Sequence, residues 1–334
     1  MTKLSTKSKP KCPALSVWEL PKLLAPMHRY KKTTSKTCRE RPHFRAILAF
    51  VNRNRFAVAA QIQRRFSKYL RSDRTARRHL VELEAMGFLG VVDTCNVSPL
   101  WPKVYFVTRR GLSRLRQALN DKGQEWTESL RDRRRSEGFS AQHVLHEILT
   151  TEFLLAVWES SQACEELEIL TTQRRSLLKH HLFTVTMGGR PTRLQPDGMF
   201  LYRQAGKGMM GCFVEMDLGT MSLKQMKTKI RRYQAWSESS TGIAFLKSLY
   251  QRHGASIPTA SHRILLVVAC KEAKAEQKRL QRLQELAGKF PADIRNRIRI
   301  TTVSHLKQAT NPQNLLSESA WYRASDGSKR SQLC

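Results

Sequence analysis

The sequence has few acidic residues for its length and lacks the long apolar stretch of a membrane protein. Of its 334 residues, 27 are Asp or Glu and 59 are Lys or Arg, so the formal net charge is +32. No run approaches the roughly 18 to 20 apolar residues that a membrane-spanning helix needs. Residues 1–13 also lack the hydrophobic core of a signal peptide. We therefore expect a cytoplasmic protein with a polyanionic partner.

Cysteine pairs at metal-binding spacing are also missing. The chain has seven cysteines, an odd number, and none of them forms a C-x-x-C pair. This pattern argues against a zinc site and against a disulfide framework. We interpret the cysteines as free thiols in a reducing compartment.

Positive charge is densest in the first third of the chain. Residues 1–42 carry a net charge of +9 and residues 43–120 a net charge of +11, against +12 for the much longer stretch 121–334. Residues 1–42 have little periodicity and are predicted to form a basic disordered arm. Affinity for nucleic acid should be concentrated in these two segments, because each phosphate contact releases counterions.

Residues 43–120 have the pattern of a winged helix-turn-helix domain. Apolar spacing predicts helices over 43–53, 57–66 and 73–86, with Ser72 as the N-cap of the third helix and Gly87 at its end. Strands are expected over 88–93 and 103–108, and a closing helix over 111–119.

The third of these helices has a basic polar face. We assign to that face Arg74, Thr75, Arg77, Arg78 and His79. In a winged helix this element lies in the major groove of DNA, where arginine pairs with guanine edges or clamps phosphates. The alternative is a solvated basic face on a winged helix that docks on protein.

Residues 139–310 are predicted to form a second, α/β domain with a mixed sheet flanked by helices. A charged linker at 121–138 would precede it and a polar tail at 311–334 would follow it. The expected helices are 139–159, 221–237 and 271–289, and the expected strands are 167–173, 182–187, 197–203, 211–217, 263–270 and 298–303.

Three carboxylates occur in or beside the strands of this second domain. Glu215 and Asp217 are two residues apart and so share a strand face, and Asp197 begins the strand before them. If these strands pair, the acids approach one another, and a hard cation such as Mg²⁺ or Mn²⁺ would relieve their repulsion. Such an ion can activate water and stabilise a scissile phosphate. The following helix could supply positive charge from Lys224, Lys227 and Lys229.

The strings PDGMF, FVEMDLGT and KIRRY, in this order behind a winged helix, resemble the PD-(D/E)xK nuclease superfamily. They are most similar to the replication-relaxation proteins of plasmids and mobile elements, and also to MOBC-type relaxases. The resemblance covers roughly residues 43–305. It rests on the combined spacing of six residues: Asp197, Glu215, Asp217, Thr220, Lys229 and Tyr233.

This resemblance implies a nuclease-like fold in which Asp197 and Glu215 hold the metal ion. The usual superfamily lysine would stand at Asp217, so a nuclease needs the lysine from the helix, with Lys229 the first choice. The helix at 139–159 would correspond to the first helix of the superfamily, which often donates an acid. Glu147 is the candidate there, with His143 one turn before it on the same face.

The resulting main hypothesis is an enzyme that docks on double-stranded DNA, at a plasmid or mobile-element site, and nicks or cleaves it with Mg²⁺ or Mn²⁺. The main rival is a non-catalytic regulator of plasmid replication or transcription, favoured by Asp217 in place of lysine. In that case Glu215 and Asp217 would be a strand-end ion pair with helix lysines. An RNA-binding adaptor is a third possibility. The helix at 271–289 could support a homodimer.

Overall fold

The computed structural model describes residues 41, 43–92, 101–120, 140–174, 178, 183–255, 262–308, 315–316, 321–324 and 330–331. The expected basic arm, apart from Arg41, and the expected linker at 121–138 lie outside these residues. Within them, no helix is long and apolar enough to cross a membrane.

The N-terminal part combines short helices with a small antiparallel sheet. Its elements are α1 (Phe44–Asn54), β1 (Ala57–Val58), α2 (Ala59–Arg65), α3 (Asp73–Ala85), β2 (Leu89–Val92), β3 (Val104–Val107) and α4 (Arg109–Asn120). The three strands pair in the order β1-β3-β2. Helix α1 buries Phe44, Ile47, Leu48 and Val51, the face that its apolar spacing predicts.

Helix α3 begins where its sequence indicates. The Ser72 hydroxyl accepts a hydrogen bond from the backbone N–H of Thr75 at 3.2 Å, so it satisfies one of the free donors of the first turn. Gly87, with φ of +72°, lies just past the end of the helix. The assignment of His79 to the polar face is wrong: it is 3% exposed, and its Nδ1 lies 2.8 Å from Nε2 of His43. The ring packs inward because His43, the N-cap residue of α1, offers it a polar partner.

The larger part of the molecule is built on a seven-stranded mixed sheet with the order β12-β11-β10-β9-β8-β7-β4. Its strands are β4 (Leu167–Arg174), β7 (Gly198–Gln204), β8 (Gly208–Asp217), β9 (His262–Val268), β10 (Ile298–Thr302), β11 (Trp321–Arg323) and β12 (Arg330–Ser331). Strands β8, β9 and β10 run parallel, and the other pairs are antiparallel. A separate hairpin joins β5 (Thr184–Met187) and β6 (Arg190–Arg193).

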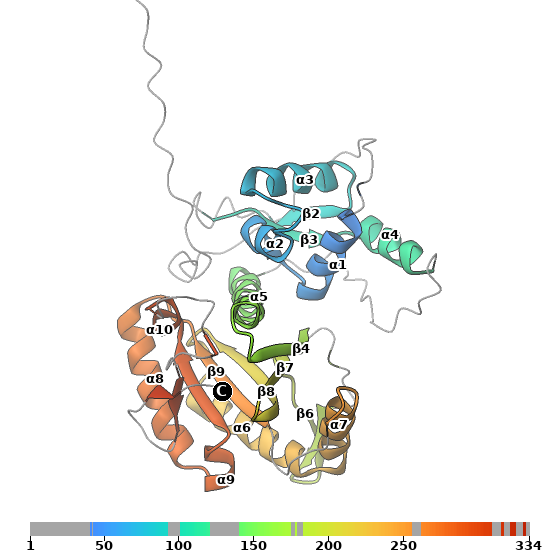
Figure 1. The fold of residues 1–334 in the computed structure, drawn as a ribbon. Coiled ribbons are helices and arrows are strands. Elements are labelled where there is room, and N and C mark those ends of the chain that lie inside the picture. Colours follow the sequence, from blue (N-terminus) through green and yellow to red (C-terminus); the bar gives the residue numbers. More distant parts are fainter. Residues whose placement is uncertain are drawn as a thin grey trace, which may run out of the picture.

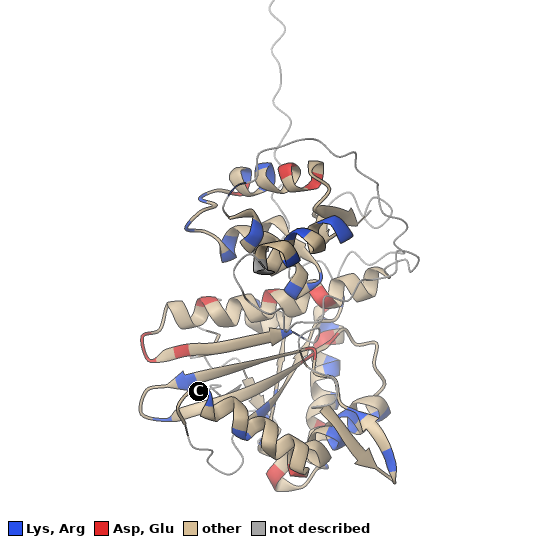
Figure 2. Ribbon diagram, turned by 90° about the vertical axis from the view of Figure 1, so that its right-hand side faces the viewer, with Lys and Arg blue, Asp and Glu red and all other residues tan. Residues whose placement is uncertain are grey.

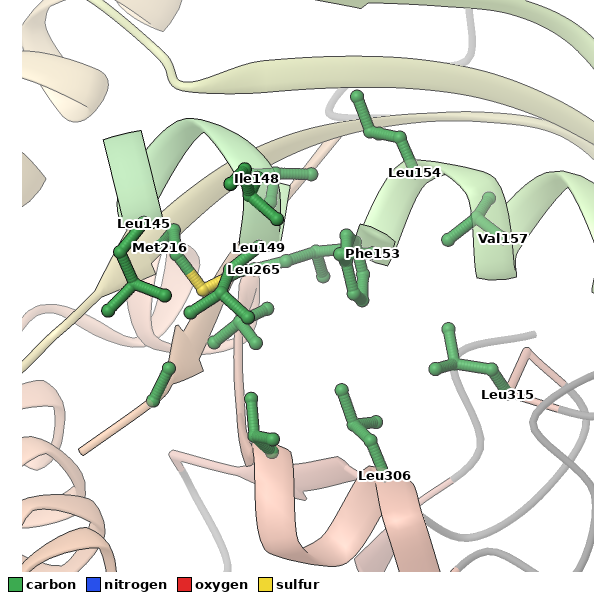
Figure 3. Close-up of a cluster of buried hydrophobic side chains, with 14 of the residues drawn as sticks. Leu145, Ile148, Leu149, Phe153, Leu154, Val157, Met216, Leu265, Leu306 and Leu315 are labelled. Carbon is green, nitrogen blue, oxygen red and sulfur yellow. The ribbon is translucent and has the colours of Figure 1, made fainter. Parts of the chain in front are cut away.

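Helices cover both faces of this sheet. The remaining elements are α5 (Ala141–Gln162), α6 (Leu223–Glu238), α7 (Ser240–Gln251), α8 (Ala273–Gly288), α9 (Ala292–Arg295) and α10 (Val303–Gln308). Helices α5 and α10 bury their apolar side chains on one face (Figure 3), and α6, α7, α8 and α9 bury theirs on the other. The fold is therefore of the mixed α and β class, as expected.

Helix α5 lies between the sheet and the N-terminal part of the chain (Figure 1). On the sheet side it packs through side chains such as Phe153, and on its other side it meets α2. There Gln61 donates to the carbonyl oxygen of Ile148 at 3.0 Å, and Arg64 pairs with Glu152 and Glu159. Helix α5 is thus buried from two directions, and it connects the basic N-terminal elements to the sheet.

Several local expectations differ from the structure. Residues 57–58 are a strand at the start of the expected second helix, because they pair with β3. Helix α7 was not predicted. The polar-tail interpretation of 311–334 is wrong for its described residues: Leu315, Leu316 and Trp321 are buried, and β11 pairs with β10. A few apolar residues in this polar stretch complete the core under α5, and local polarity does not reveal them.

Candidate active site

Two carboxylates meet where β7 and β8 pair. Gly198 pairs with Val214, so the register brings Asp197, one residue before β7, opposite Glu215 in β8. The backbone N–H of Asp197 donates to the carbonyl oxygen of Val214 at 3.0 Å, and Oδ2 of Asp197 accepts from the N–H of Met216 at 3.0 Å. The backbone pairing therefore holds Asp197 rigidly beside Glu215.

Helix α5 contributes a histidine to this pair. Nε2 of His146 lies 3.1 Å from Oδ2 of Asp197, and the imidazole is partly exposed while the carboxylate is buried. Burial opposes the charged imidazole, but Asp197 outweighs it and raises the pKa of His146. The carboxylate therefore favours the charged form of His146, which is the contacting partner of Asp197.

Helix α6 contributes two groups to Glu215. Lys229 forms an ion pair with Oε2 of Glu215, and the hydroxyl of Tyr233 donates to Oε1 at 2.5 Å. Lys229 and Tyr233 are four residues apart and therefore lie on one helix face. Because Tyr233 is fully buried and its hydroxyl is engaged by Glu215, the geometry gives it a holding role.

The two carboxylates have opposite pKa shifts. Burial raises the pKa of Glu215 to about 8, with Asp197 adding to that rise against the opposing effect of Lys229. Burial also acts to raise the pKa of Asp197, but His146 and then Lys229 hold it well below its ordinary value. Burial thus favours the neutral form of Glu215, whereas the neighbouring cations favour the charged form of Asp197.

The donor set fits a hard divalent cation. Asp197 and Glu215 offer carboxylate oxygens, which Mg²⁺ and Mn²⁺ prefer. Among the described residues no group of three or more His, Cys, Asp and Glu side chains could hold a metal ion. Mg²⁺ is typically held by one or two carboxylates, with water and substrate phosphate completing its shell. Two acids are thus sufficient for an ion that binds together with a phosphate.

Asp217 lies two residues further along β8 but has other partners. Its Oδ2 accepts from Nε of Arg279 in α8 at 2.7 Å, and its Oδ1 accepts from the N–H of Gly219 at 2.9 Å. The ion pair is nearly fully buried. The structure thus brings together Asp197 and Glu215 and gives Asp217 a structural ion pair at the end of the strand.

Glu147, the expected acid from the first helix, is paired with arginines. It is 1% exposed and lies between two arginines, with Nη1 of Arg55 at 2.8 Å and Nη2 of Arg174 at 2.5 Å. Burial would raise its pKa, but Arg174 and Arg55 lower it. His146, one residue earlier, is rotated by about 100° around the helix and reaches Asp197 in its place.

The other predicted residues of this domain have different surroundings. His143 has its Nε2 at 4.0 Å from Glu147 and packs edge-on against Phe56. Thr220 and Lys224 are exposed and Lys227 is half-buried, and the described contacts of Glu215 involve Lys229 rather than these lysines. Of the candidate lysines, Lys229 alone is therefore brought onto a carboxylate.

The predicted DNA-contacting residues lie on the outer side of α3. Arg74, Arg77 and Arg78 are exposed, and Figure 2 shows blue basic segments on the helices of this N-terminal part. Arg77 forms an exposed ion pair with Asp73 at 2.8 Å, and Thr75 is bonded to the Ser72 cap. An exposed pair of this kind contributes little to stability, so Arg77 can exchange partners at small cost.

Three residues at or near the site were not predicted: His146, Arg174 and Arg279. His146 had a weak signal, since it is a polar residue in a helix that is otherwise apolar. Arg174 closes β4 and pairs with Glu147, and Arg279 reaches Asp217 from more than 60 residues away in the sequence. No local pattern indicates pairs that are so distant in the chain.

Comparison with known proteins gives a family for this chain. A family model described as replication-relaxation matches residues 48–244, more than half of the sequence, from α1 into α7. The match includes Asp197, Glu215, Lys229 and the whole of α3. No curated protein and no solved structure matches the chain significantly.

Proposed function

The chain belongs to the replication-relaxation family, and on that premise we propose that it binds and nicks DNA during replication or mobilisation of a plasmid or mobile element. Family membership itself points to a role in replication or mobilisation of such elements. Metal-dependent, relaxase-like nicking is the finer part of the proposal.

The nicking proposal rests on one observation, the Asp197–Glu215 pair in which Lys229 forms an ion pair with Glu215. The two acids would hold Mg²⁺ or Mn²⁺, as in the PD-(D/E)xK core that we propose for residues 139–310. When bound, the ion would supply an activated water and stabilise charge on the phosphate. Lys229, which pairs with Glu215, would be placed to contact a phosphate oxygen beside the two acids. His146 contacts Asp197 and holds it in place.

Exposed arginines on α3 support DNA contact through a winged helix. We expect Arg74→Ala and Arg77→Ala each to weaken binding to a specific site by about 1–3 kcal/mol and to relax its specificity. Lys207→Gln, in the exposed turn between β7 and β8, removes one charge and serves as the control. Fluorescence anisotropy with specific and scrambled duplexes measures the difference. Equal losses on both duplexes would mean that these arginines contact phosphates only.

The nicking proposal is tested with supercoiled plasmid from the protein's own element, incubated with Mg²⁺, Mn²⁺ or EDTA. We expect metal-dependent conversion to open circle, reduced about 100-fold or more by Asp197→Asn. Glu168→Gln removes an exposed acid that pairs with Arg203 on the same sheet, and it should leave nicking unchanged. DNA binding without nicking in any metal would refute the enzymatic proposal.

One observation favours a non-catalytic regulator as the second candidate. Each acid of the pair already has a protein cation, His146 or Lys229, and Asp217 is occupied by Arg279. A regulator predicts unchanged function after Asp197→Asn in a plasmid-maintenance assay, and an enzyme predicts loss of maintenance or transfer.

A further inference from the structure

Three arginines lie next to one another on the face of the sheet that α5 covers. They are Arg263 on β9, Arg299 on β10 and Arg323 on β11. Arg299 pairs directly with Arg323, and it also pairs with Leu265, two residues after Arg263 on the same strand face. Like charges directly opposite one another in a sheet are destabilising. The arrangement therefore costs free energy unless an anion offsets it.

These arginines have little compensation from the protein. Arg299 is 5% exposed, and its Nη1 donates to the carbonyl oxygens of Asn296 and Ile298 at 2.9 and 3.0 Å. Its Nε has no hydrogen-bond partner among the described residues, and neither does Nε of Arg263. None of the three forms an ion pair with a described carboxylate. Burial, followed by Arg263 and Arg323, lowers the pKa of Arg299 to about 10.

A surface cavity of about 270 Å³ adjoins this cluster. Its lining is formed by Met210, His262, Arg263, Asp293, Asn296 and Arg297. Arg263 thus belongs to both the cluster and the cavity, and the carbonyl oxygen of Asn296 accepts from Arg299. His262 is opposite Gly211, four residues before Glu215 on β8 or about 13 Å along the strand. The cavity is therefore separate from the carboxylate pair.

The cavity carries an excess of positive charge. Burial, with Arg297, lowers the pKa of His262 to about 3, so its imidazole is neutral and its buried Nδ1 has no partner among the described residues. Asp293 is exposed and supplies one negative charge against Arg263 and Arg297. The available donors are therefore planar guanidinium groups, which suit the oxygens of a phosphate.

We propose that this cavity and the adjoining arginines form a phosphate-binding site, with Arg263 and Arg297, which line the cavity, and the neighbouring Arg299 and Arg323 as its cationic groups. The phosphate belongs either to a small nucleotide or to the backbone of a DNA strand. The volume lies below the range of typical cofactor pockets, so it suits a phosphate with its sugar. The site does not depend on nicking, and its test does not measure nicking.

The first experiment compares thermal unfolding of the full-length protein in sodium phosphate and in sodium chloride, at equal pH and ionic strength. We expect phosphate to raise the wild-type Tm by roughly 3 °C or more. Arg323→Gln, at an exposed position, and Arg263→Gln should lose most of this shift. In chloride, Arg323→Gln should be at least as stable as wild type, because it removes a like-charge neighbour. Lys278→Gln, at an exposed position of α8 on the other side of the sheet, is the control that keeps the shift.

A second experiment distinguishes the sources of the phosphate. Arg323→Gln and Arg263→Gln are titrated with deoxythymidine monophosphate and with a single-stranded oligo-dT. A backbone site predicts a 3- to 10-fold loss of oligonucleotide affinity and a smaller salt slope, and a nucleotide site predicts weakening for the monophosphate alone. The proposal is overturned if phosphate gives no shift beyond chloride, or if both variants retain the full shift.

Discussion

Glu147 and Glu215 are two equally buried glutamates that lie in different surroundings. Glu147 joins α5 to the N-terminal part, and Glu215 lies in β8 beside Asp197. Their exposures are 1% and 2%, and each is bonded to a cation. Yet the pKa of Glu147 is lowered, whereas burial raises that of Glu215 to about 8.

The difference comes from the number of charges around each acid. Glu147 is paired with two arginines, whereas Glu215 is paired with one lysine and lies beside a second carboxylate, Asp197, which His146 contacts. An acid with two cations is suited to holding two parts of a protein together. An acid with one cation and a neighbouring acid is better suited to gaining a cation from solution. Depth of burial alone would not separate a structural from a functional glutamate.

The largest expected effect on stability comes from Glu147, which is paired with two arginines. Glu147→Gln leaves Arg55 and Arg174 facing each other without a counter-charge, and it should lower the free energy of unfolding by about 3–5 kcal/mol. Urea denaturation at pH 7 measures this, with the exposed Glu168→Gln as a control that should change stability by less than about 1 kcal/mol. Equal, small effects of both variants would remove the structural role of Glu147.

A second prediction concerns pH and the proton on Glu215. Its folded-state pKa lies above its unfolded value, so its contribution to stability is fully present below about pH 4.5. That contribution is lost as pH rises through about 8. In EDTA, the stability of the wild type should therefore decline between pH 6 and 9 more than that of Glu215→Gln. Mn²⁺ affinity should rise over the same range, because the ion competes with this proton.

Parallel pH curves for wild type and Glu215→Gln in EDTA would mean that Glu215 is already ionised, as Glu147 is. A wild-type Mn²⁺ affinity that is independent of pH would lead to the same conclusion.

A smaller effect, on Mn²⁺ affinity, is expected for His146, through which α5 contacts Asp197. His146→Gln keeps a side chain able to donate a hydrogen bond to Asp197 but removes the positive charge. We expect about 10-fold tighter Mn²⁺ binding, because a positive charge beside Asp197 no longer repels the incoming cation or competes with it for this carboxylate. Calorimetric titration measures it, and His143→Gln, one turn away on α5, is the matched control. Equal tightening by both variants would assign the effect to the helix and not to the contact with Asp197.

The smallest effect on stability is expected for Lys229→Met. Without its lysine, Glu215 can stay protonated and bonded to Tyr233, so the free energy of unfolding at pH 7 should fall by less than about 1 kcal/mol. Arg174→Met provides the contrast, because Glu147 would then lose one of its two counter-charges. Urea denaturation measures the loss of unfolding free energy for both variants. Comparable losses from Lys229→Met and Arg174→Met would show that Glu215 depends on its cation as strongly as Glu147 does.

Helix α5 was predictable from the sequence only in part. Its existence and approximate ends were predictable from a long apolar stretch after Ser140. Its orientation was not, because the sheet and the N-terminal part bury it from both sides and leave no clear polar face. Choosing between His146 and Glu147 requires knowing which side faces Asp197, and this depends on the packing of α5 against β7 and β8.

The sequence alone was sufficient for the elements whose signals are local. These include the Ser72 cap of α3, the buried strands, and the shared helix face of Lys229 and Tyr233. The register that sets Asp197 opposite Glu215 depended on the pairing of β7 with β8. Tertiary structure decided which acids are paired with arginine: Arg279 pairs with Asp217, and Arg55 and Arg174 pair with Glu147. The physical reason is that the charge state of a buried group depends on neighbours within a few ångströms, and folding draws those neighbours from distant parts of the chain.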